Sequence, residues 1–147
     1  MIRAVLFDLD RTLLDRDSSI QAFAVSQFEK FQSRLGDTAR EEFVEAFIRL
    51  DARGLKWKDA VYQALVQELS LVRLSWEELY ADFLACVGDF YRPFPGLHEM
   101  LTDLGTKYTL GLITNGRTEF QKRTITALGI ASFQRNPHLR RGRGEET

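Results

Sequence analysis

The stretch AVLFDLD, residues 4–10, decides how the rest of the chain is interpreted. Its continuous apolar run predicts a strand over residues 4–7 that is buried on both faces, as in a parallel sheet. Two carboxylates, Asp8 and Asp10, follow at the carboxyl end of this strand. Open α/β sheets bind their ligands at that edge. The stretch therefore predicts an α/β protein with a functional site beside Asp8.

A second apolar run, TLGLI at residues 109–113, ends in a polar turn in the same way. Thr114, Asn115 and Gly116 form this turn, and a helix is expected to follow it as far as about Leu128. Two strands that each deliver polar groups at their carboxyl ends predict a single site where those ends meet.

The segment between the two strands is helical in pattern. A parallel crossover needs only a dozen or so residues, so residues 16–92 are interpreted as a separate helical module inserted into the α/β core. Lys56 and Lys58, within this module, are interpreted as solvated helix lysines. The expected helix signals are a cap at Asp17 or Ser18, breaks at Gly36 and near Gly54, a cap at Ser75, and, after Pro95, a helix that stops at Gly105.

The last segment differs from both parts. Residues 134–147 hold four arginines and one aliphatic residue and show no periodicity, so we expect a disordered basic tail. The predicted organisation is a core of residues 1–15 and 93–133, a helical module of residues 16–92, and this tail.

Composition excludes several functional classes. Twenty basic and twenty-one acidic residues give a net charge of −1, which offers no electrostatic basis for nucleic-acid or membrane-surface binding. Cys86 is the single cysteine and cannot form an internal disulfide. No apolar run approaches the roughly 20 residues of a membrane span. We therefore expect a cytoplasmic protein.

Asp8 and Asp10 have the chemistry of a phosphate-transfer site. One carboxylate can attack as a nucleophile while its neighbour gives and takes the proton, and together they offer hard oxygen ligands for Mg²⁺. The alternative is an ordinary turn in which aspartates bond nearby backbone N–H groups. If the strand continues, both side chains lie on one side of the pleat; if a turn begins, they fan around a common point.

The second turn suits a phosphate oxyanion. A Thr114 hydroxyl, an Asn115 amide and backbone N–H groups at the start of a helix are the donors that such an anion requires. The alternative is a polar turn with no ligand.

Taken together, the two turns and the helical insertion resemble the haloacid dehalogenase-like hydrolase superfamily, in its branch with a helical cap after the first strand. The family's first motif, D-x-D-x-T, matches Asp8, Asp10 and Thr12, and its second motif matches Thr114. The resemblance covers nearly everything up to Phe133. It implies an incomplete Rossmann-like parallel-sheet core with an inserted all-helical cap.

The resemblance also implies a role for each residue. Asp8 would attack the phosphoryl group and ligate Mg²⁺, and Asp10 would transfer protons and ligate Mg²⁺ through its carbonyl. Thr114 and the Asn115 N–H would hold the transferring phosphate. The implied function is Mg²⁺-dependent hydrolysis of a small phosphorylated metabolite through an aspartyl-phosphate on Asp8. Haloacid dehalogenation is an alternative, which Asp10 argues against because the dehalogenase branch is expected to lack that acid.

Two parts that the resemblance requires have no counterpart. The family's phosphate-binding Lys and its acidic metal motif are both C-terminal, yet no Lys follows Gly129. One alternative is thus an inactive truncated fragment. Reading the codons of residues 133–147 one base out of frame permits FNAILISEEEGVKKP, which looks like the missing Lys region. We hypothesise a frameshift, which an uninterrupted coding frame for this tail would overturn.

Overall fold

The computed structural model describes residues 1–133 and divides the chain into two compact units. One unit contains residues 1–16 together with the chain from Tyr91 onward, and the other contains Asp17–Phe90. The predicted tail of residues 134–147 lies outside the described residues.

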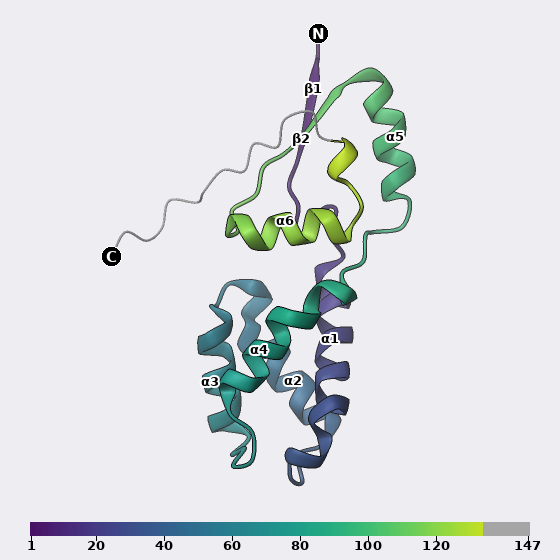
Figure 1. Cartoon of the computed structure of the whole chain (residues 1–147). Helices are drawn as coiled ribbons and strands as arrows, with labels where there is room; N and C mark the ends of the chain where they lie inside the picture. The colour runs from purple at the N-terminus through teal and green to yellow at the C-terminus, as the bar shows by residue number, and fades with distance from the viewer. Residues whose placement is uncertain (134–147) are drawn as a thin grey trace, which may run out of the picture. The chain divides into compact units, whose positions relative to one another are not determined.

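The first unit is an α/β unit built on two parallel strands. β1 (Ala4–Phe7) pairs with β2 (Thr109–Leu112) in a register that sets Phe7 opposite Leu112. Figure 1 shows the two strands with helices α5 (Leu97–Lys107) and α6 (Thr118–Ala127), and a short 3₁₀ turn, η4 (Ala131–Phe133), follows α6. The predicted strands and their parallel arrangement are confirmed, and the fold is a partial Rossmann-like core with a helical insertion.

The core of this unit lies on one face of the sheet. Leu110 and Leu112 of β2 are buried in a cluster with residues of both helices, whereas Leu6 and Ile113 on the other face are 56% and 44% exposed. The prediction of a strand buried on both faces is therefore wrong for the described residues. Helices α5 and α6 both pack on the face that carries Leu110 and Leu112, so among the described residues they cover only that face. The helical residues of the cluster are Leu97, Leu101, Ile125 and Leu128.

Helix α5 runs past the predicted stop at Gly105 and ends at Lys107. Glycine weakens a helix interior but does not end it unless the backbone turns there. The turn comes at Tyr108, whose extended φ of −134° leads directly into β2 and whose N–H still donates to the Leu104 carbonyl.

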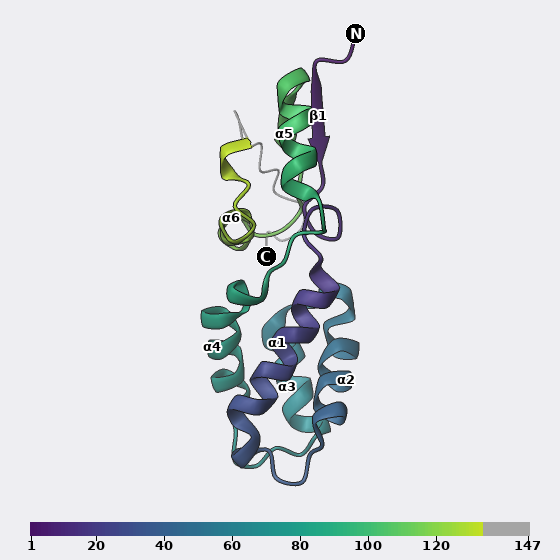
Figure 2. The same ribbon diagram turned by 90° about the vertical axis from the view of Figure 1, so that its right-hand side faces the viewer.

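The second unit is a helical bundle, seen from two directions in Figures 1 and 2. Its four helices are joined by short 3₁₀ turns and loops, and aromatic rings fill its core. Phe23 and Phe83 pack edge to face with ring centroids 5.4 Å apart, and Phe47 packs against Tyr62 at 5.3 Å. The helices are α1 (Arg16–Phe31), α2 (Arg40–Asp51), α3 (Lys58–Glu68) and α4 (Trp76–Cys86), with 3₁₀ segments η1 (Gln32–Arg34), η2 (Ala52–Gly54) and η3 (Val87–Phe90). α1 begins at Arg16, just before the predicted caps.

Polar side chains are also buried inside the bundle. Gln27 donates to the Leu79 carbonyl and to Asp82 Oδ2, both at 3.0 Å, and accepts from the Tyr62 hydroxyl at 2.9 Å. Lys58 forms an ion pair with the buried Asp51, and its side chain is only 13% exposed. The interpretation of Lys58 as a solvated lysine is thus wrong, because Asp51 supplies a buried partner that helical periodicity does not reveal.

Ser75 caps α4 as predicted, and the structure adds a second bond to the cap. Ser75 accepts from the Glu78 N–H and its own N–H donates to the Glu78 carboxylate, which is a capping box. The same carboxylate accepts two hydrogen bonds from the Arg34 guanidinium, at 2.8 and 2.9 Å. Arg34 first, and then the Ser75 N–H, lower the pKa of Glu78 to about 2.

A lowered pKa makes the contribution of Glu78 to stability depend on pH. The ionised carboxylate stabilises the folded chain above its unfolded pKa near 4.5, and this contribution is lost as the pH falls towards 2. We expect wild type to be more stable than Glu78→Gln at pH 7 and the difference to shrink between pH 4.5 and 2. Urea unfolding followed by tryptophan fluorescence measures this difference in the free energy of unfolding, since Trp57 and Trp76 both lie in this unit. A difference that stays constant over this range, or one that Glu77→Gln reproduces, would contradict the assignment.

No helix within residues 1–133 combines the length and the apolar character needed to cross a membrane.

Candidate active site

The chain turns sharply as soon as β1 ends. The Leu9 carbonyl accepts hydrogen bonds from the N–H groups of Thr12, Leu13 and Leu14 at 3.0–3.3 Å, and Arg11 adopts a positive φ of 63°. Leu9 is fully buried and anchors this turn in the core. Of the two arrangements left open by the sequence, the structure shows the turn, so the carboxylates before and after Leu9 fan out from the sheet edge.

Asp8 is the exposed carboxylate of the pair. The Thr12 hydroxyl, four residues along the turn, donates to its Oδ2 at 3.3 Å. This bond restrains Oδ2, one of the two carboxylate oxygens. An exposed, oriented carboxylate is the geometry that a nucleophile needs.

Thr114 and Asn115 lie at the same edge of the sheet as Asp8. The Ile113 N–H donates to the Phe7 carbonyl at 2.8 Å, so the parallel pairing continues to the last residue before each polar turn. Thr114 is 3% exposed, whereas Asn115 is exposed. The N-cap of α6 is Arg117, whose side chain makes no hydrogen bond to the first turn of that helix. Backbone N–H groups at the start of a helix can donate to an anion.

The residue bonded to Asp10 is one that the sequence analysis did not identify. Gln121, on α6, is buried, and its Nε2 donates to Asp10 Oδ2 at 3.4 Å. Thr124, one turn further along α6, is also buried and donates to the Phe120 carbonyl at 3.1 Å. Both polar residues lie on the face of α6 that carries the buried Ile125. The sequence does place Gln121 and Thr124 on the same helix face as Ile125, and this pattern indicates polar side chains directed towards the interior.

Tyr91 is a further neighbour of Asp10 that the sequence analysis missed. Burial raises the pKa of the Tyr91 hydroxyl, and the negative charge of Asp10 raises it further. A hydrogen bond with the Thr124 side chain and the charge of Arg16 act in the opposite direction. Asp10 thus sits beside neutral polar groups supplied by two other segments of the chain.

The donor atoms at this edge suit Mg²⁺. The Asp8 carboxylate and the Asp10 carbonyl are hard oxygen donors, and Mg²⁺ in proteins keeps several waters while one or two carboxylates and a substrate phosphate hold it. Within residues 1–133, no group of three or more His, Cys, Asp and Glu side chains is arranged to hold a metal by itself. The Asp8 carboxylate and the Asp10 carbonyl would supply two ligands of a magnesium ion, and water and substrate would supply the others.

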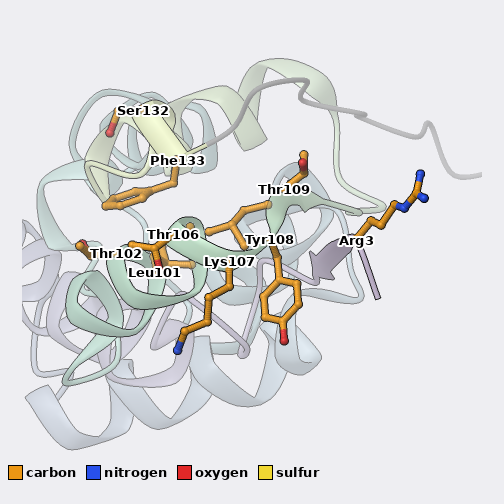
Figure 3. Close-up of a pocket in the computed structure, with 11 residues that line it drawn as sticks. Arg3, Leu101, Thr102, Thr106, Lys107, Tyr108, Thr109, Ser132 and Phe133 are labelled. Carbon is orange, nitrogen blue, oxygen red and sulfur yellow. The ribbon is translucent and has the colours of Figure 1, made fainter. Parts of the chain in front are cut away.

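A hollow of about 500 Å³ lies at the opposite end of β2 and is separate from this site. Figure 3 shows it bordered by Arg3, Lys107, Tyr108 and Thr109, which stand at the amino-terminal ends of the strands, and by Phe133. Ligands of open α/β sheets bind at the carboxyl ends. The candidate active site is therefore the edge that carries Asp8 and Thr114.

Comparison with known proteins agrees with this architecture. A family profile described as haloacid dehalogenase-like hydrolase matches residues 5–135. A search of curated proteins finds no match.

Solved structures match nearly the whole chain. The hydrolase YfnB of Bacillus subtilis, solved with magnesium bound, has a TM-score of 0.68 and 19% identity, covering 94% of this chain and 65% of its own. A subfamily IA hydrolase of Geobacter sulfurreducens has a TM-score of 0.62 and 19% identity, covering 94% and 62%. A 2-haloacid dehalogenase of Pseudomonas syringae has a TM-score of 0.50 and 25% identity, covering 95% and 64%. The chain spans less than two thirds of the length of each of these structures.

Proposed function

Because the chain belongs to the haloacid dehalogenase-like hydrolase family over residues 5–135, we propose that it hydrolyses phosphomonoesters with Mg²⁺ through an aspartyl-phosphate on Asp8. The observation that carries the proposal is the tight turn after β1. This turn presents the exposed Asp8 carboxylate, whose Oδ2 accepts from the Thr12 hydroxyl. The Asp10 carboxylate, two residues later, accepts a hydrogen bond from Gln121 of α6. The substrate class is a small phosphorylated metabolite.

The first half of the reaction transfers the phosphoryl group to the protein. Asp8 Oδ1 attacks phosphorus, the bond between phosphorus and the ester oxygen breaks, and Asp10 gives its proton to the departing alcohol. The Thr114 hydroxyl and the Asn115 N–H donate to the phosphoryl oxygens. The position of both residues after β2, at the same edge as Asp8, supports this role.

The second half regenerates the carboxylate. Asp10, now ionised, takes a proton from water as the water oxygen attacks phosphorus, and the bond between Asp8 and phosphorus breaks to release inorganic phosphate. The Asp8 carboxylate and the Asp10 carbonyl would hold Mg²⁺, which when bound neutralises negative charge on the phosphate oxygens. The helical unit, residues 17–90, is proposed to act as the cap that selects the leaving group, and its place as a cap stays a prediction.

Haloacid dehalogenation is the second candidate because of the likeness to the Pseudomonas syringae enzyme. In that reaction Asp8 would displace halide from carbon and no proton donor to a leaving alcohol is needed. An acid at position 10, held by a hydrogen bond from Gln121, favours phosphate transfer over this chemistry.

The proposal is tested with purified chain and p-nitrophenyl phosphate as a generic aryl phosphate. We expect phosphate release with Mg²⁺ and its loss when EDTA removes the metal, with no halide released from 2-chloropropionate. Halide release independent of Mg²⁺ would instead establish the dehalogenase. A folded chain with neither activity would contradict the proposal and favour the alternative of an inactive fragment.

A further inference from the structure

We propose that Gln121 is a positioning residue that fixes the orientation of the Asp10 carboxylate, and that Gly116 makes this possible by leaving room for the glutamine amide. The consequence for catalysis rests on the proposed function, in which Asp10 transfers the proton. The orientation of Asp10 itself does not depend on that function and is measured separately below.

The first observation is the half-satisfied state of Gln121. Its side chain is 95% buried (5% exposed) and its Nε2 donates to Asp10 Oδ2, while its Oε1 is buried without a hydrogen-bond partner among the described residues. Burying an amide with one end unbonded costs free energy that an apolar side chain at this position would avoid. The compensating role visible in the structure is the bond to Asp10, which joins segments 111 positions apart.

The second observation is the contact between Gln121 and Gly116. A Cβ atom on residue 116 would lie 1.8 Å from Gln121 Nε2 and 2.6 Å from its Cδ, far inside van der Waals contact. Gly116 leaves the space that the Gln121 amide occupies. Its φ is not among the positive values that favour glycine, so the role of this glycine here is steric. The colliding atoms belong to the far end of a flexible side chain, so a larger residue at 116 would move the amide rather than unfold the loop.

Together these contacts restrict Asp10. A carboxylate side chain exchanges among several staggered rotamers unless a partner favours one of them. The bond from Gln121 to Oδ2 restrains the carboxylate and with it the direction in which Oδ1 is presented. The loop after β2 thus affects the orientation of the Asp10 carboxylate after β1, because Gly116 has no side chain that would displace the Gln121 amide.

The test uses two variants that break the contact from opposite sides. Gln121→Met keeps the length of the side chain and removes its hydrogen bonds, and Gly116→Ala displaces an unaltered glutamine. Gln63→Met, at an exposed glutamine of α3, is the matched control. The readouts are the NMR couplings between Hα and the two Hβ protons of Asp10, which report whether the side chain holds one rotamer, and the steady-state constants for aryl phosphate hydrolysis.

We expect one Asp10 rotamer in wild type and in Gln63→Met, and averaged couplings in Gln121→Met and Gly116→Ala. We also expect kcat to fall about 10-fold in the last two, with KM changed less than 2-fold, because misorientation acts on the transition state and not on binding. Unchanged Asp10 couplings overturn the proposal whatever the turnover. Averaged couplings with unchanged kcat overturn the catalytic role of the positioning. If wild type hydrolyses nothing, the proposed function fails while the couplings still decide the orientation.

Discussion

Asp8→Asn is expected to lower the rate of aryl phosphate hydrolysis by about 10³-fold or more. The substitution keeps the shape of the side chain and an oxygen that can accept from the Thr12 hydroxyl, so the turn after β1 should persist. It removes the negative charge and the nucleophilic oxygen on which the aspartyl-phosphate would form. The measurement is phosphate release under Mg²⁺ at saturating substrate, with circular dichroism to establish that the variant is folded.

Asp103→Asn is the matched control for this experiment. Asp103 lies exposed on α5 in the same unit, and its carboxylate accepts from Lys107 one helical turn away, at 3.2 Å. An exposed pair of this kind contributes little to stability, so this variant should retain wild-type turnover. If Asp8→Asn keeps more than a tenth of the activity, Asp8 is not the nucleophile and the assignment of the site is wrong.

The largest expected effect on stability comes from the aromatic core of the helical unit. Phe47→Ala should lower the free energy of unfolding by about 3–5 kcal/mol, because it removes a fully buried ring and leaves a cavity. The contact with Tyr62, whose ring centroid lies 5.3 Å away, is lost as well. Urea unfolding followed by tryptophan fluorescence reports on this unit, since both tryptophans of the chain lie in it.

Ile48→Ala is the control, because Ile48 neighbours Phe47 on α2 but is 38% exposed. A partly exposed side chain loses less burial and leaves no closed cavity, so its removal should cost about 1 kcal/mol. Equal costs for the two variants would show that Phe47 does not pack into the core as described.

Local patterns were sufficient to predict much of the fold. The run of residues 4–7 and its counterpart at 109–112 are strands, and they pair in parallel as their continuous apolar character indicates. Ser75 caps α4, as its place before that helix predicts. These features depend on residues a few positions apart, so the sequence contains all that is needed to find them.

Predictions that needed the neighbours of a residue in space were less successful. Gly105 was expected to end a helix. Helix α5 instead continues to Lys107, because the backbone becomes extended only at Tyr108, which leads into β2. Lys58 was expected in solvent and is instead paired with a buried Asp51. In both cases the outcome depends on a contact with another segment of the chain, which the preferences of single residues do not predict.

The same distinction applies to the candidate site. The sequence by itself determined that carboxylates follow the first strand and that a polar turn follows the second, since strand ends and turns are local features. Only the tertiary structure decided that Gln121 reaches Asp10 past Gly116, and that one face of the sheet carries both helices. The hydrogen bond between Gln121 and Asp10 joins residues 111 positions apart, and the shared face of the sheet brings together helices from two different segments. Their geometry is set by how strands and helices pack, which no local pattern specifies.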